Sequence, residues 1–133
     1  MTQEDKELLL TDICARFRYN VMVNVIDYND ETYSQDGTLL DIINTNADCN
    51  GTPYLFRVSN VPTLVDITEI KPYLRPLSSM TSSEKGWYDR LRSSTIAYAA
   101  LIDWLNENHF DYRGLIEKGL AIEITKENNP YKE

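Results

Sequence analysis

A run of alternating valines is the feature that most constrains the fold of this chain. Val21, Val23 and Val25 occupy every second position of the segment from residue 19 to residue 26. Because successive side chains of a strand point to opposite faces, this spacing predicts a strand with one strongly apolar face. The periodicity before this segment is helical, so the strand also marks where an N-terminal helix ends.

Residues 1–18 are the predicted N-terminal helix. Thr2 followed by Asp5 is a capping-box-like start, with Asp in place of the usual Glu or Gln. Apolar positions at helical spacing mark the face expected to be buried: Leu9, Leu10, Ile13, Cys14 and Phe17. Cys14 is interpreted as a small core residue on this face rather than as a nucleophile.

Residues 19–80 carry further strand signals. The expected elements, in chain order, are a strand at residues 38–43, a polar loop at 44–52, and strands at 54–58 and 64–67. Short strands spaced by roughly ten residues predict a small antiparallel barrel-like sheet, with SH3-like and Sm-like barrels as fold analogies. The predicted class is therefore α+β, and the analogy implies no activity.

Two prolines set a further expectation for this sheet. Pro72 and Pro76 lack the backbone N–H that a central strand donates to its neighbours. We therefore expect residues 70–77 to form a bend followed by a short edge strand.

Residues 81–124 are predicted to be a helical section with a short terminal strand. Thr81 and Glu84 have the spacing of a capping box. Gly86 and the polar cluster at residues 93–95 interrupt the pattern, so two helices are expected. Their apolar stripes are Trp87, Tyr88 and Leu91 on the first, and Tyr98, Leu101, Ile102 and Leu105 on the second.

The corner from Asp111 to Gly119 follows these helices. Asp111 is predicted to cap a further short helix after these two, because its carboxylate can accept hydrogen bonds from free backbone N–H groups. Leu115 is expected in the core, and Gly119 suits a C-terminal cap with positive φ. A short strand at residues 120–124 and a frayed polar tail at residues 125–133 complete the prediction.

Composition excludes several classes of protein. The chain has 133 residues, a length that indicates a single domain. Its formal net charge of −8 argues against binding to nucleic acid or anionic lipid. Its start does not resemble a secretory signal, and its apolar runs are far shorter than the ~20 residues of a membrane-spanning helix. We therefore expect a cytoplasmic protein without a membrane partner, in which Cys14 and Cys49 are free thiols.

Two stretches resemble an uncharacterised family. ITEIKPYLRPLSSMT at residues 67–81 and HFDYRGLIEKGLAIE at residues 109–123 resemble short proteins of Bacteroides-type gut bacteria, often encoded among phage-derived genes. The N-terminal EDKELLLTDICARF is also similar. The family reads Leu-Pro-Tyr-Gly-Val where this chain has residues 17–21, so Arg18 stands in place of Pro. The family has no assigned catalytic residues, so the resemblance implies a prophage context and no chemistry.

No metal or cofactor is expected from the sequence. The loop that begins at Asn46 imitates the start of a calcium loop, but Arg57 stands where a bidentate Glu belongs, and the segment at residues 27–31 fails in a similar way. One His and two distant Cys residues are not a recognisable zinc ligand set. His109 is the candidate general base of a hydrolase, but no nucleophile signature accompanies it. We favour the alternative that His109 satisfies the terminal carbonyls at the end of a helix.

Two surfaces are candidates for a protein partner. Six acidic residues and no basic one lie between residues 19 and 56, mostly in expected loops, and Asp30 and Asp48 represent this surface. It is either a solvated rim or a contact for a basic partner. Tyr112 and Arg113 are of the residue types that anchor interfaces. The alternative, which we favour, is that Arg113 pairs with Asp111 or Glu117 to hold the corner.

The leading hypothesis is a non-enzymatic accessory protein of phage or prophage origin that acts by protein–protein contact. A nucleic-acid-associated small barrel is the first alternative. A small hydrolase that uses His109 is the second.

Overall fold

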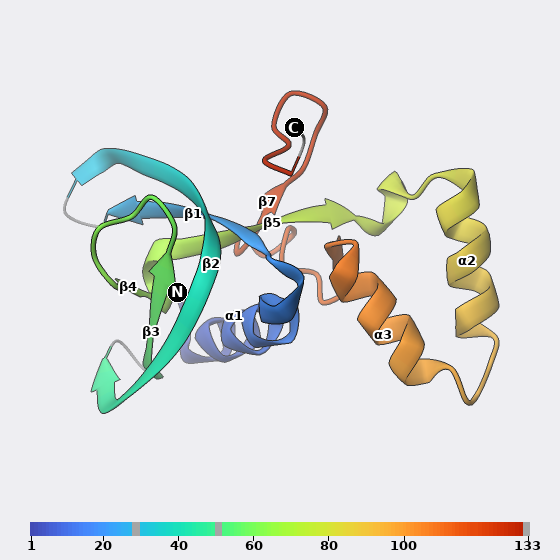
Figure 1. Ribbon diagram of the computed structural model, residues 1–133, viewed down its shortest axis with the longest axis horizontal. Coiled ribbons are helices and arrows are strands. Elements are labelled where there is room, and N and C mark those ends of the chain that lie inside the picture. The colour runs from blue at the N-terminus through green and yellow to red at the C-terminus, as the bar shows by residue number, and fades with distance from the viewer. Residues whose placement is uncertain (28–29, 50–51, 132–133) are drawn as a thin grey trace.

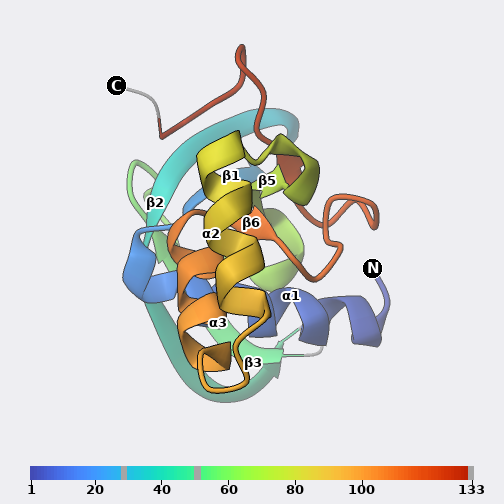
Figure 2. The same cartoon turned by 90° about the vertical axis from the view of Figure 1, so that its right-hand side faces the viewer.

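The computed structural model describes residues 1–27, 30–49 and 52–131. The chain is α+β, as predicted: helix α1 (Gln3–Arg16) precedes a seven-stranded sheet, and helices α2 (Ser82–Arg92) and α3 (Tyr98–Glu107) follow its fifth strand. Figure 1 shows the strands β1 to β4 and α1 at one end of the molecule and the α2–α3 hairpin at the other. Seen from that other end, α2 lies in front of α3 (Figure 2).

The sheet is mixed and open. Its strands are β1 (Met22–Asp27), β2 (Asp30–Cys49), β3 (Thr52–Val58), β4 (Val65–Asp66), β5 (Ile70–Pro76), β6 (Phe110–Asp111) and β7 (Ile122–Glu123). The order is β4-β3-β2-β1-β5-β6, with β7 also paired to β5. Pairs among the first five strands are antiparallel, whereas β6 and β7 run parallel to β5. Over the described strands the sheet curves strongly (Figure 1) but does not close into a barrel.

Strand β2 is longer than predicted, because residues 44–49 continue the strand instead of forming a loop. Its first part pairs with β1 and its second part with β3, so one strand connects both halves of the curved sheet. Gly37 lies where these pairings meet. A Cβ atom there would overlap the carbonyl oxygen of Ser59, so only glycine allows this close approach.

Strand β5 corrects the expectation of a short edge strand. It spans seven residues and lies centrally, with β1 along its start and β6 and β7 along its end. Pro72 pairs with Val23 at the end of the β1 contact, and Pro76 pairs with Asp111 at the end of the β6 contact. Each proline therefore lies where one neighbour stops, and the missing N–H interrupts no continuous ladder.

The main core lies between α1 and the sheet. Its fully buried side chains include Leu9, Ile13, Val21, Val23, Val25, Phe56, Ile67, Ile70, Leu74 and Leu115. The predicted alternation of buried valines is confirmed. The prediction for Cys14 is wrong, because its side chain is exposed. Two charged residues of α1 that the apolar pattern does not include, Asp12 and Arg16, are also completely buried.

A second, smaller cluster lies under the hairpin. Leu101, Leu105 and Phe110 are buried there, and Tyr88 and Leu91 of α2 pack against them. Thr81 and Glu84 form the predicted capping box at the start of α2. The break between α2 and α3 is also confirmed.

The corner after β6 contains a turn where a short helix was predicted. The Asp111 carboxylate accepts from the backbone N–H groups of Leu115 (2.9 Å) and Ile116 (3.0 Å), as a cap does. At the other end Gly119 has φ +73°, and the Leu120 N–H donates to the Leu115 carbonyl, which is a Schellman motif. Both caps exist, but only one turn of chain lies between them.

Candidate functional site

The predicted Tyr112–Arg113 corner is attached to the N-terminal helix. Asp12, which is fully buried, accepts from Arg113 Nη1 at 2.8 Å and from Arg16 Nε at 2.9 Å. Arg16 also donates to the carbonyl of Phe110. One carboxylate therefore links α1 to the corner. The pairing of Arg113 follows the favoured structural interpretation, but its partner is Asp12, not Asp111 or Glu117.

Tyr112 is also held by its own chain. Its hydroxyl donates to Asn106 Oδ1 at 2.8 Å, and the Arg113 guanidinium lies 4.5 Å from its ring centroid. Both residues are partly buried. These contacts give both side chains a role in holding the fold, and a role of the corner in partner binding stays a prediction.

His109 lies at the end of α3 in a left-handed conformation, with φ 61°. Its ring stacks on Tyr131, with centroids 4.1 Å apart, and Tyr131 accepts from the Met22 N–H at 2.8 Å. Tyr131 is thus fastened to the sheet, so the predicted fraying does not extend to this residue.

The environment of His109 is that of a neutral imidazole. Burial, followed by the positive charges of Arg16 and Arg75, lowers the pKa of His109 to about 4. Within the described chain its Nδ1 is buried and has no hydrogen-bond partner, so this nitrogen does not form the nucleophile–base pair that a hydrolase needs.

Five of the six acidic residues between residues 19 and 56 lie along β2, and Asp27 is the last residue of β1. Asp30 and Asp48 are within this strand, but their side chains lie outside the described part of the structure. Asp36 accepts from the Tyr73 hydroxyl at 2.6 Å and from Asn24 at 2.9 Å, so its carboxylate is used internally. Burial and this acidic neighbour raise the pKa of Tyr73. Over the described residues, no group of three or more His, Cys, Asp or Glu could hold a metal ion.

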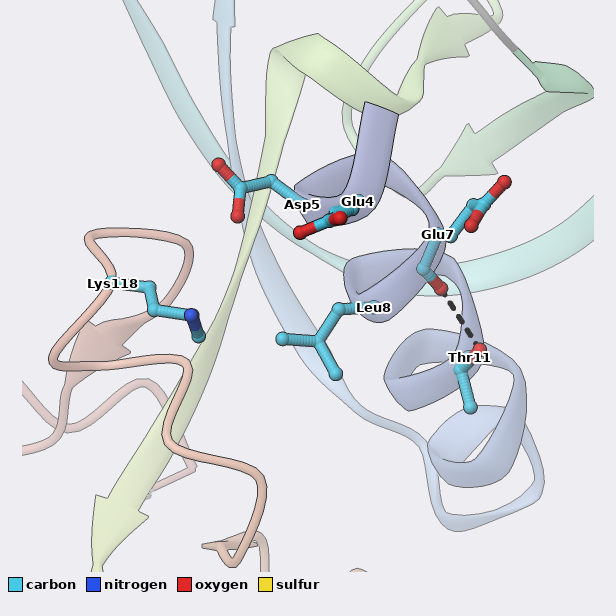
Figure 3. A pocket seen from close by; sticks show the side chains of 6 residues that line it. All are labelled: Glu4, Asp5, Glu7, Leu8, Thr11 and Lys118. Carbon is cyan, nitrogen blue, oxygen red and sulfur yellow. Dashed lines mark hydrogen bonds between the residues drawn. The ribbon is translucent and has the colours of Figure 1, made fainter. Parts of the chain in front are cut away.

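A shallow acidic hollow lies beside α1 (Figure 3). Glu4, Asp5 and Glu7 line it from the helix, and Lys118 of the corner is its one basic lining residue. Thr11 uses its hydroxyl to cap the Glu7 carbonyl at 2.8 Å. The hollow is open to solvent, and acidic side chains in water need no partner. We therefore interpret it as an ordinary solvated surface.

The α2–α3 hairpin presents the large apolar side chains that a folded core would normally cover. Ile96 is 94% exposed, Tyr98 is 69% exposed and Trp87 is 48% exposed. The sequence patterns assigned Trp87 and Tyr98 to buried stripes, and the structure corrects both assignments. The signal that was available is the length of the hairpin: two short helices packed on each other cannot cover all their apolar positions.

A groove lies between α2 and the 3₁₀ turn at Leu77–Ser79. It holds about 420 Å³ and is lined by Leu77, Ser78, Met80, Lys85, Tyr88, Asp89 and Arg92. The positions from α2 follow the spacing of one helix face. On the helix surface nearby, Arg90 lies 5.3 Å from the Trp87 ring centroid, and Arg92 lies 5.3 Å from that of Tyr88.

A salt bridge fixes the base of the hairpin. Arg75 of β5 binds Glu84 through two 2.8 Å hydrogen bonds, and its guanidinium lies 4.2 Å from the Phe110 ring centroid. The hydrogen bond from Arg75 is the main reason why the pKa of Glu84 is lowered to about 2. The exposed residues of α2 are therefore held on a helix that is locked to the sheet at its start.

Comparison with family models, curated proteins and solved structures finds no match to this chain. Among the described helices, none is long and apolar enough to cross a membrane.

Proposed function

We propose that this protein acts by protein–protein contact and that the α2–α3 hairpin is the surface it uses. The observation that carries the proposal is the exposure of Trp87, Ile96 and Tyr98 on one projecting element. Single exposed apolar residues are ordinary, but several on one element are typical of interaction surfaces. Trp and Tyr are also enriched among the residues that dominate binding energy.

The arrangement of the hairpin supports the same proposal. It projects from the end of the molecule opposite to β2 and β3 (Figure 1), so a partner can reach it without contacting the acidic sheet. Its start is fixed by Arg75 and Glu84. Binding would therefore cost little ordering of the backbone, which favours affinity.

Affinity capture from a lysate of the source cells tests this function. The triple variant Trp87→Ser/Ile96→Ser/Tyr98→Ser should lose the proteins that the wild-type chain captures. The matched control is Leu40→Ser/Leu64→Ser, which removes two exposed apolar side chains, 52% and 41% exposed, from the sheet end. Both variants should keep the wild-type circular dichroism spectrum. Loss of capture in the control, with capture retained in the triple variant, would move the interface to the sheet.

A further inference from the structure

We propose that the groove between α2 and Leu77–Ser79 binds an acidic peptide segment of the partner protein, with an apolar side chain of that segment seated between two cations. This inference rests on the proposed function, because it names the partner chemistry that the hairpin recognises. The groove supplies an apolar floor and positive charge at both ends of it.

The floor of the groove is apolar and accessible. Leu77 is 39% exposed, and Met80 and Tyr88 are only partly buried although they pack on the second core cluster. Tyr88 lies in the middle of α2, between Lys85 and Arg92 in sequence. A side chain such as Leu, Ile or Phe entering here would cover surface that water now contacts.

The cations stand on either side of this floor. Lys85 and Arg92 are seven positions apart, which separates their Cα atoms by roughly 10 Å along the helix axis. That span matches about three positions along an extended chain, so acidic residues three positions apart, with an apolar residue between them, reach both cations. The groove thus favours a segment in which acidic residues lie on both sides of an apolar one.

Neither cation has a carboxylate partner among the described residues, and the Arg92 guanidinium lies 5.3 Å from the ring centroid of Tyr88 in the groove floor. By contrast, Arg75 pairs with Glu84, and both Arg16 and Arg113 pair with Asp12. Asp89 is the one acid in the lining, and it repels a carboxylate placed at the centre of the groove. This repulsion favours an apolar residue at the centre and acids at the ends.

A peptide fits these charges better than a nucleic acid does. A nucleic-acid strand presents phosphates at regular intervals and needs a continuous basic track, whereas this groove offers two separated cations with an acid between them. The net charge of −8 also repels a long polyanion. A short acidic segment contacts only the positive groove, so it avoids the repulsion of the acidic sheet.

A phage-displayed library of random short peptides, selected on the immobilised full chain, tests this proposal. The selected peptides should be enriched in Asp or Glu on both sides of an aliphatic or aromatic residue. A fluorescein-labelled peptide of the selected sequence should then bind, by fluorescence anisotropy, roughly tenfold or more weakly to Lys85→Glu/Arg92→Glu than to the wild type. Leu77→Ser should also weaken binding, because it removes part of the apolar floor.

Two variants of the same helix sharpen the test. Arg90→Glu makes the same kind of charge change outside the groove and should leave the affinity within about twofold of wild type at physiological salt. Asp89→Asn removes the repelling acid and should tighten binding of the selected peptide. A loss in Arg90→Glu equal to that in the single variant Lys85→Glu, which makes the same charge change, would overturn the proposal, because net charge alone would then explain both.

Other outcomes separate this inference from the proposed function. Selected peptides without acidic residues, or no enrichment at all, would overturn the acidic-peptide inference, while the hairpin function would stand if the triple variant still lost capture. Tight binding of an oligothymidine strand that Lys85→Glu/Arg92→Glu abolishes would make the groove a nucleic-acid site. A wild-type dimer by sedimentation that the same variant dissociates would make a second copy the occupant.

Discussion

At the scale of single residues, the Asp12 carboxylate is shared by two arginines. It is completely buried and pairs with one guanidinium that is also completely buried, that of Arg16, and with a second, Arg113, whose side chain is 20% exposed. A buried charge is tolerated only when its partners compensate for lost hydration. The two arginines are therefore not equivalent.

This difference predicts a clear order of stabilities. Asp12→Ala should cost about 3–5 kcal/mol, because it leaves Arg16 buried without a carboxylate. Arg113→Ala should cost roughly 1–3 kcal/mol, since Asp12 keeps Arg16 as a partner. Arg18→Ala should change stability by about 0.5 kcal/mol or less, because Arg18 and its neighbour Asp103 are exposed and 4.0 Å apart. Urea unfolding measures all three, and a costly Arg18→Ala beside a mild Asp12→Ala would contradict this view.

At the scale of elements, two glycines occupy opposite environments. Gly37 in β2 has no room for a Cβ atom because of the Ser59 carbonyl, whereas Gly86 in α2 has nothing within 4 Å of that position. Close contact with backbone is costly because the backbone cannot move aside as a flexible side chain does.

The same substitution should therefore act with opposite signs. Gly37→Ala should destabilise the protein by about 1–3 kcal/mol or more through overpacking where β2 leaves β1 and joins β3. Gly86→Ala should stabilise it by roughly 0.5–1 kcal/mol, because alanine restricts the unfolded chain and suits a helix interior. Thermal unfolding followed by circular dichroism distinguishes the two. A stabilising Gly37→Ala would mean that β2 and Ser59 are not in close contact.

The elements also show which features the sequence could predict. The capping box at Thr81 and Glu84, the Asp111 cap and the buried valines each depend on residues close together in the chain, so their patterns predicted them. The position of β5 depends on β1, β6 and β7, and no local pattern around Pro72 contains them.

The candidate surface was missed for a related reason. A helical stripe indicates which residues share a face, but it does not tell whether another element covers that face. Trp87 and Tyr98 belong to apolar stripes, yet nothing in the described chain covers them fully. Burial of Asp12 and Arg16 was equally invisible, because their partners Arg113 and Phe110 lie about a hundred positions away.

At the scale of the whole molecule, acid should lower the stability. The folded state lowers the pKa of His109 from 6.5 to about 4 and that of Glu84 from 4.5 to about 2. At pH values between the folded and unfolded pKa of each group, the unfolded chain binds more protons than the folded one. The free energy of unfolding therefore falls as the pH falls. The His109 contribution is complete above pH 6.5 and is lost by about pH 4.

Urea unfolding at a series of pH values tests this dependence. Wild-type protein should lose stability on the order of 3 kcal/mol from His109 across this window. His109→Asn keeps a residue that tolerates positive φ and should remove the pH dependence that arises from His109. Glu84→Gln should keep the His109 dependence and flatten the contribution that appears only below pH 4.5. An unchanged slope in His109→Asn would show that other groups cause the acid sensitivity.

The long-range contacts of α1 and β1 also have a consequence for biosynthesis. Asp12 and Arg113 are 101 positions apart, and Met22 and Tyr131 are 109 apart. A ribosome adding about 5–20 residues per second exposes α1 for roughly 5–20 s before its partners emerge. During that interval Asp12 and Arg16 must stay hydrated, so the helix cannot settle against the valines of β1 in its final position. We therefore expect folding to complete only after translation of the corner, with the nascent N-terminal half available to chaperones until then.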